Sequence, residues 1–203
     1  MNVNHAGKKS EKNSWEKLVK SAFFLFQNRE SYDTLIRTAQ MIVEKCISRG
    51  YMDKSKVLEL IRELHRIDHF SGNAGLEIVD VGRGFCKGKI RVSELHLNPL
   101  QTVHGGVMYT MADTISGLAA ATAGNPGPTV SGDMYFMRPA TGCTEIYCES
   151  RIIKRGSHIN VVEASILNDK GEELARAVMQ YMPLYRDDAS SEAFILPDLT
   201  IEE

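Results

Sequence analysis

Apolar residues over the first seventy positions recur at intervals of three and four, a spacing that places them on one face of an α-helix. Three segments show this pattern. Their apolar residues are Trp15, Leu18, Val19, Ala22, Phe23 and Phe26 in the first, Leu35, Ile36, Ala39, Ile42, Val43, Cys46 and Ile47 in the second, and Val57, Leu58, Ile61 and Leu64 in the third. Short amphipathic helices cannot bury their apolar faces alone. We therefore predict a helical extension over residues 1–69 that packs on itself or on the rest of the chain.

Punctuating residues mark the limits of these helices. Gly50 ends the second helix, and Asp53 or Ser55 can cap the third. The run Ser71–Gly75 is rich in small turn-forming residues and predicts a break in the chain.

After residue 70 the pattern changes to alternating, β-branched segments, which are typical of strands. We predict six strands, at Leu76–Val81, Phe85–Val92, Val130–Arg138, Ile146–Lys154, Ile159–Leu167 and Glu173–Leu184. Between the second and third strands lies a helix over about Gly106–Ala121 that is apolar nearly all round, and such a helix is a buried one. The order predicts an α+β fold over residues 70–185, an antiparallel sheet wrapped around a long central helix. An acidic tail occupies residues 186–203.

The composition fits a soluble globular protein. The 203 residues are 43% hydrophobic and 25% charged, with a formal net charge of −2, which excludes low-complexity, collagen-like and largely disordered chains. Residues 1–70 carry 13 Lys and Arg against 9 Asp and Glu, and residues 71–203 carry 11 against 17, so neither part has the excess typical of a polyelectrolyte-binding protein. No apolar run approaches the ~18 residues of a membrane helix. The four cysteines lack CxxC spacing, which favours reduced thiols and a cytoplasmic location.

The residues best suited to chemistry lie at the start of the central helix. Gly105 and Gly106 leave backbone amides accessible at the positive end of the helix dipole. Such a site suits an oxygen that gains negative charge, as when a carbonyl becomes a tetrahedral oxyanion. Asp113 lies two turns later in an otherwise apolar helix, where an unpaired carboxylate is costly to bury, and it is a candidate general base.

The spacing of these two groups has a consequence for assembly. Gly105 and Asp113 are eight residues apart, which is about 12 Å along one helix axis. An oxyanion donor and a base must both lie about 3 Å from the reacting group. If both act on one substrate, they must come from two subunits, and the sequence then predicts a homodimer.

The segment around the two glycines resembles the hotdog-fold acyl-CoA thioesterases, in particular their phenylacetyl-CoA (PaaI-type) branch. The pattern of that family is Asn, five residues, His-Gly-Gly, six residues and Asp. The chain has this pattern without a gap, at Asn98, His104, Gly105, Gly106 and Asp113. Residues 129–140 and the turn at residues 154–156 are also similar to the family. The resemblance covers residues 70–185, and the expected strand order agrees with the hotdog order.

The resemblance implies a role for each residue of the pattern. The Gly105 amide would polarise the thioester carbonyl with help from Asn98, and His104 would shape the loop that leads into Gly106. Asp113 of the partner subunit would activate water as a general base or attack the carbonyl carbon directly. Hydrolysis of this kind needs no metal and no cofactor, because the coenzyme A thioester is itself the substrate.

Further residues are implied on the substrate side and in the assembly. Ser131 matches a hydroxyl position that helps to orient the water. Arg155 and Gly156, in the turn after the fourth strand, would face the coenzyme A phosphates. Residues expected to line the acyl site are Tyr109, Met111, Thr114, Met134 and Phe136. The dimers of this family are expected to pair further into a dimer of dimers, with no membrane or nucleic-acid partner.

Plainer interpretations exist for most of these positions. Asp113 can be a salt-bridged helix acid, Asn98 a turn residue before a proline, Ser131 an ordinary strand hydroxyl and Arg155 a solvated hairpin charge. We favour a functional role for Asp113 and Asn98 and leave Ser131 and Arg155 open.

His65 and His69 lie four residues apart beside Asp68, a spacing that can bind a metal ion. No HExxH context surrounds them, so we interpret them as a solvent-facing pair.

Two other functions fit parts of the sequence. A hotdog hydratase or dehydratase would use a histidine base with a helix carboxylate, but the two glycines directly after His104 argue against it. A non-catalytic acyl-CoA-sensing regulator would carry a DNA-binding region in front of a hotdog domain. The helical start of the chain has that outline, yet Lys54 and Lys56 near Gly50 supply few cations for phosphate contacts.

Overall fold

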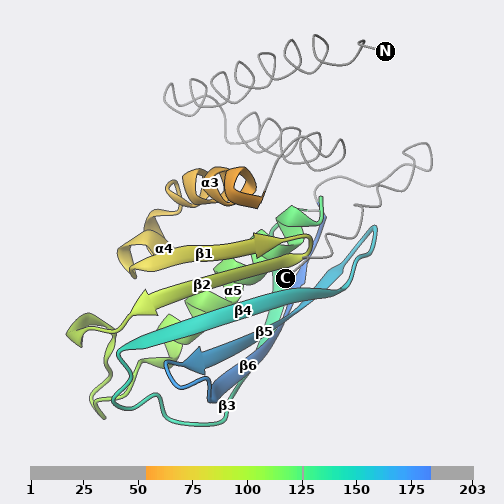
Figure 1. Ribbon diagram of the computed structural model, residues 1–203. Coiled ribbons are helices and arrows are strands. Elements are labelled where there is room, and N and C mark those ends of the chain that lie inside the picture. Colours follow the sequence, from red (N-terminus) through yellow and green to blue (C-terminus); the bar gives the residue numbers. More distant parts are fainter. Residues whose placement is uncertain (1–53, 125, 184–203) are drawn as a thin grey trace, which may run out of the picture. The chain divides into compact units, whose positions relative to one another are not determined.

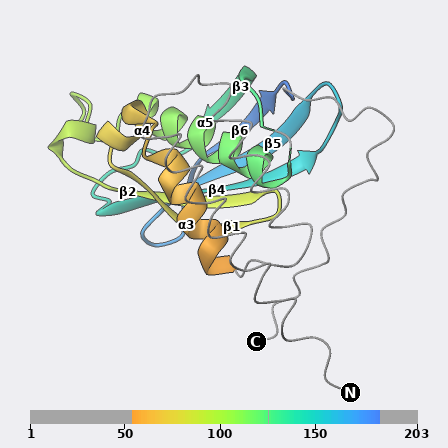
Figure 2. The ribbon, with the colours of Figure 1, turned by 90° about the horizontal axis from the view of Figure 1, so that it is seen from above.

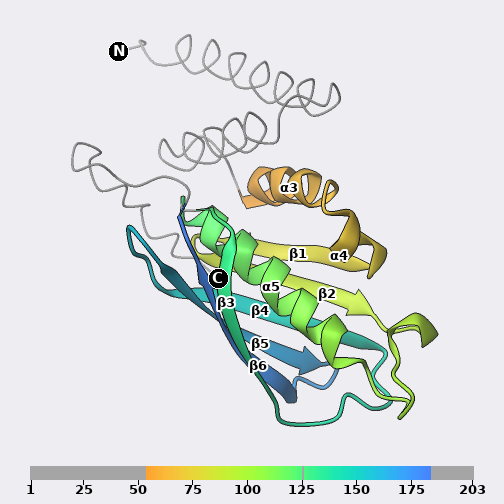
Figure 3. The same cartoon turned by 180° about the vertical axis from the view of Figure 1, so that it is seen from behind.

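Six antiparallel strands and one long helix form the centre of the computed structural model, which describes residues 54–124 and 126–183. The elements are α3 (Lys54–His65), α4 (His69–Asn73), β1 (Leu76–Gly82), β2 (Phe85–Arg91), the 3-10 turn η1 (Glu94–His96), α5 (Gly105–Thr122), β3 (Thr129–Phe136), β4 (Glu145–Lys154), β5 (Asn160–Asn168) and β6 (Glu173–Tyr181). The sheet order is β1-β2-β4-β5-β6-β3, and α5 lies across one face of the sheet (Figures 1 and 3). The predicted α+β hotdog fold is confirmed.

Helix α5 is buried because both its composition and the sheet beneath it allow a close approach. Eight of its residues are buried, among them Met111, Ile115 and Ala119. Gly88 on β2 makes room for the helix, since a Cβ there would lie 2.4 Å from the Cδ1 atom of Ile115. A side chain at position 88 would therefore push α5 away from the sheet, and with it the residues that α5 carries.

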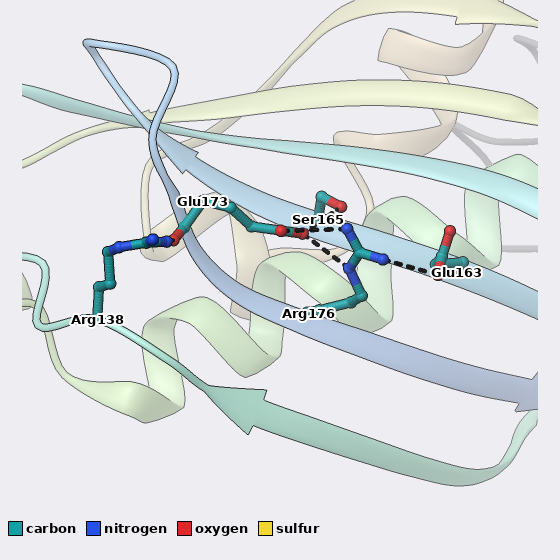
Figure 4. Close-up of polar contacts among 5 residues, drawn as sticks. All are labelled: Arg138, Glu163, Ser165, Glu173 and Arg176. Carbon is teal, nitrogen blue, oxygen red and sulfur yellow. Dashed lines mark hydrogen bonds and ion pairs between the residues drawn. The ribbon is translucent and has the colours of Figure 1, made fainter.

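The strands alternate between the helix-facing side and an outer polar side. On β4, Ile146, Cys148 and Ser150 are buried, whereas the residues between them face outward. Cross-strand ion pairs cover the outer side, with Lys87 Nζ 2.7 Å from Glu149 Oε1. Further along the sheet, Arg176 lies between Glu163 and Glu173 (Figure 4).

Helix α3 packs along the β1 edge of the sheet (Figures 1 and 2). Its Ile61 side chain is buried in the core, and Arg62 Nε donates a hydrogen bond of 2.8 Å to the carbonyl oxygen of Ile78 on β1. The third predicted helix thus joins the hotdog core. The first two predicted helices, Gly50, Asp53 and the acidic tail lie outside the described residues.

The connection between α3 and β1 differs from the prediction. Ser71–Gly75 is not a simple break, because α4 continues to Asn73 and the chain turns only at Gly75, where φ is +71°. Asp68 makes this short helix possible, since its carboxylate accepts hydrogen bonds from both the amide and the hydroxyl of Ser71. Ser55 lies within the first turn of α3, and Asp53, the other residue considered as its cap, lies outside the described residues.

The histidine pair near this connection is also not solvent-facing as predicted. His65 is only 9% exposed, and its Nε2 atom lies 2.7 Å from the Ser71 hydroxyl oxygen. Burial lowers the pKa of His65, although the nearby Asp68 charge opposes this. His69 is exposed. The two rings therefore occupy different environments, and the described residues contain no group of three or more His, Cys, Asp or Glu side chains placed to hold a metal ion.

Candidate active site

The N-terminus of α5 presents one backbone amide that has no partner among the described residues. His104 is the N-cap residue, and its Nδ1 atom accepts a hydrogen bond of 2.9 Å from the amide of Gly106. Nδ1 carries no proton while it accepts this bond, and the bond fixes the orientation of the His104 ring. Among the residues that the structure describes, none accepts a hydrogen bond from the amide of Gly105. His104 therefore caps α5 through the Gly106 amide and leaves the Gly105 amide available to an incoming oxygen.

The loop before α5 is held by a second histidine that the sequence did not single out. His96 is 8% exposed, and its carbonyl oxygen accepts a hydrogen bond of 2.8 Å from the amide of His104. Its Nδ1 atom accepts the amide of Ser93 at 3.0 Å, and its Nε2 atom lies 3.1 Å from the carbonyl oxygen of Ala74. His96 thus ties the cap of α5 to the end of α4. Sequence periodicity could not have found it, since its role depends on contacts with distant residues.

Asn98 organises the same loop through its side chain. Its Oδ1 atom accepts hydrogen bonds from the backbone amides of Leu100 and Thr102, at 2.9 and 3.3 Å. Its Nδ2 atom donates a hydrogen bond of 2.8 Å to the Thr102 hydroxyl. These bonds support the left-handed backbone at Gln101, where φ is +57°. The turn role and the functional role considered for Asn98 are compatible, because one amide proton of its side chain is still free of a described partner.

Asn98 and Gly105 face a shared pocket of about 300 Å³. The pocket is lined by Asn98, Thr102, Val103, Gly105, Met108, Phe136, Met137, Arg138, Pro139 and Ala140. The Phe136 ring lies directly over Gly105, since a Cβ at position 105 would be 3.2 Å from its Cζ atom. At the rim, Arg138 Nη1 donates a hydrogen bond of 2.7 Å to the carbonyl oxygen of Glu173 (Figure 4). A carbonyl bound to the Gly105 amide would therefore meet an aromatic wall.

Asp113 lies farther along α5 and is held by hydroxyl groups. The Thr129 hydroxyl donates to its Oδ1 atom at 2.7 Å. The Tyr181 hydroxyl lies 2.7 Å from the backbone oxygen of Asp113 and 3.3 Å from its Oδ1 atom. No salt bridge to Asp113 is formed within the described residues. The ion-paired helix acid considered as the plainer interpretation is thus not what the described residues form.

The two halves of the candidate site do not meet within one chain. Asp113 does not line the pocket that contains Gly105, and both residues lie on the same straight helix. The chain therefore presents an open amide N–H at one place and a carboxylate about 12 Å away along the helix.

The remaining candidates lie in varied surroundings. Tyr109 donates a hydrogen bond of 3.3 Å to the carbonyl oxygen of Gly132 on β3, and Thr114 is half-buried on α5. Met134 packs against the core and Met111 is fully buried in it, so Phe136 is the one member of the expected acyl lining that faces the described pocket.

Ser131 and the coenzyme A turn stay predictions. A register shift between Thr129 and Ser131 places Ser131 opposite Gln180, and the hydroxyl that contacts Asp113 is that of Thr129. In the turn, the amide of Gly156 donates to Asn160 Oδ1 at 3.1 Å, and a Cβ at position 156 would lie 2.5 Å from a backbone oxygen. Arg155 beside it is exposed.

Comparison with known proteins finds a family model that matches part of this domain. Residues 100–175, which include α5 and the strands β3, β4 and β5 that follow it, match the family model of the thioesterase superfamily. This part of the chain is similar to the thioesterase superfamily. The match agrees with the resemblance to thioesterases that the sequence motifs indicated.

Individual relatives agree with this assignment. Mouse acyl-coenzyme A thioesterase 13 is 33% identical over 82 residues, which are 39% of this chain and 59% of that protein, so the match spans less than two thirds of the relative. Acyl-coenzyme A thioesterase PaaI of Escherichia coli is 24% identical over 101 residues, 50% of this chain and 72% of that protein. The PaaI-type resemblance is thereby supported.

Solved structures match the fold over the same region. The E. coli PaaI protein from the phenylacetic acid degradation operon superposes with a TM-score of 0.60 at 20% identity, covering 66% of this chain and 96% of that one. A thioesterase protein of Streptococcus pneumoniae, solved with coenzyme A, has a TM-score of 0.56 at 20% identity and covers 61% and 99% of the two chains. Among the described residues, no helix is both long and apolar enough to cross a membrane.

Proposed function

We propose that this protein is an acyl-CoA thioesterase that hydrolyses a thioester to a free acid and coenzyme A. The observation that carries the proposal is the Gly105 amide, which has no partner in the described structure and opens on a pocket at the positive end of α5. His104 supports it by occupying the next amide, that of Gly106. The thioester carbonyl oxygen would bind at Gly105, with Asn98 beside it.

The complete site forms between two subunits, with Gly105 from one and Asp113 from the other. A free strand edge supports this part of the proposal, because β3 is the last strand of the sheet and several large apolar side chains on it or directly after it are exposed. These are Val130, Tyr135, Phe136 and Met137, which are between 48% and 63% exposed. Pairing of two β3 edges would cover them and bring the two helices together, and such dimers would assemble further into a dimer of dimers.

The reaction needs only groups that the chain and the substrate supply. The oxygen of a water molecule attacks the carbonyl carbon while a carboxylate oxygen of Asp113 takes one of its protons. The oxyanion that forms is stabilised by the Gly105 amide. The carbon–sulfur bond then breaks, and the departing thiolate takes the proton from Asp113. In the alternative route, Asp113 attacks the carbon itself and water hydrolyses the resulting anhydride.

A single turnover in ¹⁸O-labelled water separates the two routes. Direct attack of water places the label in the free acid at once, whereas hydrolysis of an anhydride at the Asp113 carboxyl carbon leaves the label on the enzyme in the first turnover.

Coenzyme A recognition is assigned to the turn between β4 and β5. Arg155 is exposed there, and the tight backbone at Gly156 fixes the shape of the turn. A guanidinium is well suited to phosphate oxygens. A related S. pneumoniae thioesterase has been solved with coenzyme A, which supports this class of ligand.

A panel of acyl-CoA substrates with aryl and medium-chain aliphatic groups, read by release of the free thiol, tests the proposal. We expect hydrolysis of at least one member, and loss of it in Asp113→Ala by at least about 100-fold with the far-ultraviolet circular dichroism unchanged. Glu77→Ala, which removes an exposed carboxylate from β1, is the control and should keep full turnover.

Three outcomes would contradict the proposed thioesterase function. Hydration of crotonyl-CoA without thiol release would indicate a hydratase. Acyl-CoA binding without turnover, together with sequence-selective DNA binding, would indicate a regulator. Unchanged turnover in Asp113→Ala would refute the assigned mechanism.

A further inference from the structure

We propose that Tyr181 is a positioning residue for Asp113, and that together with Thr129 it holds one oxygen of the carboxylate so that the other faces the reacting group. This inference rests on the proposed function, because it assigns a task to Asp113 that only catalysis requires. Two hydroxyl groups converge on Oδ1 of Asp113, that of Thr129 at 2.7 Å and that of Tyr181 at 3.3 Å. Oδ2 accepts no hydrogen bond from the described residues.

The sheet register brings the two hydroxyls together. Thr129 on β3 lies directly opposite Tyr181 on β6, so the two side chains share the face that carries α5. The register then shifts before Ser131, whose partner is Gln180, the neighbour of Tyr181 on β6. Because adjacent strand residues point to opposite faces, the shift separates Ser131 from the Thr129–Tyr181 pair. The irregularity thus selects which hydroxyl of β3 reaches Asp113.

A glycine on α5 makes room for the tyrosine ring. Gly117 lies one turn after Asp113 on the same face of the helix. A Cβ at position 117 would be 3.4 Å from the Cε1 atom of Tyr181 and 3.9 Å from its hydroxyl oxygen. An alanine would just touch the ring, and a larger side chain would displace it. Glycine inside a helix costs about 1 kcal/mol relative to alanine, and here the close approach of the ring explains its presence.

Burial makes the Tyr181 hydroxyl a permanent donor. The side chain is only 2% exposed, and burial first, then the charge of Asp113, raises the pKa of Tyr181 well above its usual value. The other titratable group that acts on this hydroxyl is Cys148 on β4, whose pKa burial raises to about 12, so it is neutral. Tyr181 therefore stays protonated in the folded protein and can only donate to Asp113.

The same hydroxyl also holds the helix backbone at this residue. Its shorter contact, 2.7 Å, is to the carbonyl oxygen of Asp113. The one proton of the hydroxyl is shared between this carbonyl oxygen and, at the longer distance, Oδ1, so a single group on β6 contacts both the main chain and the side chain of Asp113. This fixes the direction of Oδ2 and removes rotations that the carboxylate would otherwise lose on reaching the transition state.

Tyr181→Phe tests the inference, because it removes the hydroxyl and keeps the ring. We expect kcat to fall about tenfold with KM nearly unchanged, because the carboxylate loses its orientation and the substrate contacts are kept. A Thr129→Val substitution should act in the same direction, and Thr129→Ser should retain most of the activity.

Tyr147→Phe is the matched control. Tyr147 on the outer side of β4 also donates a hydrogen bond from its hydroxyl to a carboxylate, that of Glu145, and its loss should change neither kcat nor KM. Gly117→Val should reproduce the kinetic effect of Tyr181→Phe by displacing the ring.

The result that overturns the inference is distinct from the one that overturns the proposed function. If Asp113→Asn is inactive while Tyr181→Phe has the wild-type kcat, the positioning role fails and the base assignment stands. A Tyr181→Phe variant that loses only thermal stability, at unchanged kcat per folded molecule, also refutes it. If Asp113→Asn itself turns over normally, the catalytic assignment fails first.

Discussion

Gly105 meets two requirements that no other residue type meets together. Its amide must stay open to a ligand, and its Cα must lie beneath the Phe136 ring without a side chain between them. The adjacent Gly106 serves differently, because its amide is bound by His104 and a Cβ there would be 2.9 Å from the same Nδ1 atom. The sequence predicted a double glycine with bare amides. The structure distinguishes one open amide from one capped amide.

Gly105→Ala should lower kcat/KM by about tenfold while the protein stays folded. The added methyl group would lie 3.2 Å from the Phe136 ring, which must shift into the pocket where the thioester would bind. Steady-state kinetics on an active acyl-CoA measure the effect. Gly72→Ala is the control, since nothing lies within 4 Å of a Cβ at that position and its φ is not positive. Unchanged kinetics in Gly105→Ala would remove this glycine from the site.

At the scale of elements, the connection through α3 and α4 shows what periodicity could and could not predict. The apolar spacing of Val57, Leu58, Ile61 and Leu64 predicts a helix, and α3 is that helix. Helix α4 was missed because its stability comes from Asp68, Ser71 and His65 acting together, and not from an apolar stripe. Turn-forming residues predict a break where a side-chain network favours one further turn of helix.

His65 should make this protein less stable as the pH falls below neutrality. Its folded-state pKa is lowered by burial, so the unfolded chain binds more protons than the folded one as the pH drops through about 6.5, the unfolded-state value. The stabilisation is fully present above that pH and is lost as the pH decreases toward the folded-state pKa. Urea unfolding at several pH values measures it. His65→Gln should flatten the dependence.

The exposed neighbour provides the comparison for that measurement. His69→Gln removes a histidine from the same connection without removing a buried ring, and it should leave the pH dependence as it is in the wild type. Equal slopes for wild type and His65→Gln would mean that the buried histidine does not couple protonation to folding.

At the scale of the whole molecule, the spacing of Gly105 and Asp113 along α5 determines how the candidate site can be assembled. A base and an oxyanion donor on one helix, two turns apart, cannot serve one reacting carbon. A second copy related by a twofold axis would place the Asp113 of one chain at the Gly105 of the other. Each dimer would then hold two sites, each made from both chains.

Mixed dimers test this arrangement directly. Asp113→Ala and Gly105→Val should each be inactive alone, the second because its larger side chain collides with Phe136. Co-expressed, they should regain about a quarter of the wild-type activity, since half of the dimers are mixed and each mixed dimer has one intact site of two. Activity is measured on the co-expressed sample after its content of mixed dimers has been established by affinity tags. No recovery in a sample shown to contain mixed dimers would place the whole site within one chain.

The sequence by itself determined where the strands lie along the chain, the buried helix between them and the residues at the start of that helix. These follow from local information, because alternation, helical spacing and glycine pairs are written in consecutive residues. It also identified Asp113, since a carboxylate within an apolar helix stands out without any structure. The predicted strand limits differ from those of the structure by at most three residues, the largest difference being at the end of β6.

Only the tertiary structure decided which groups contact Asp113 and which hold the loop before α5. Thr129 and Tyr181 are 52 residues apart in sequence and become partners through the pairing of β3 with β6. His96 acquires its role from Ala74 and His104, which reach it through separate elements. Register, a one-residue shift in it and the depth of burial depend on contacts between distant strands, and a linear pattern does not encode them.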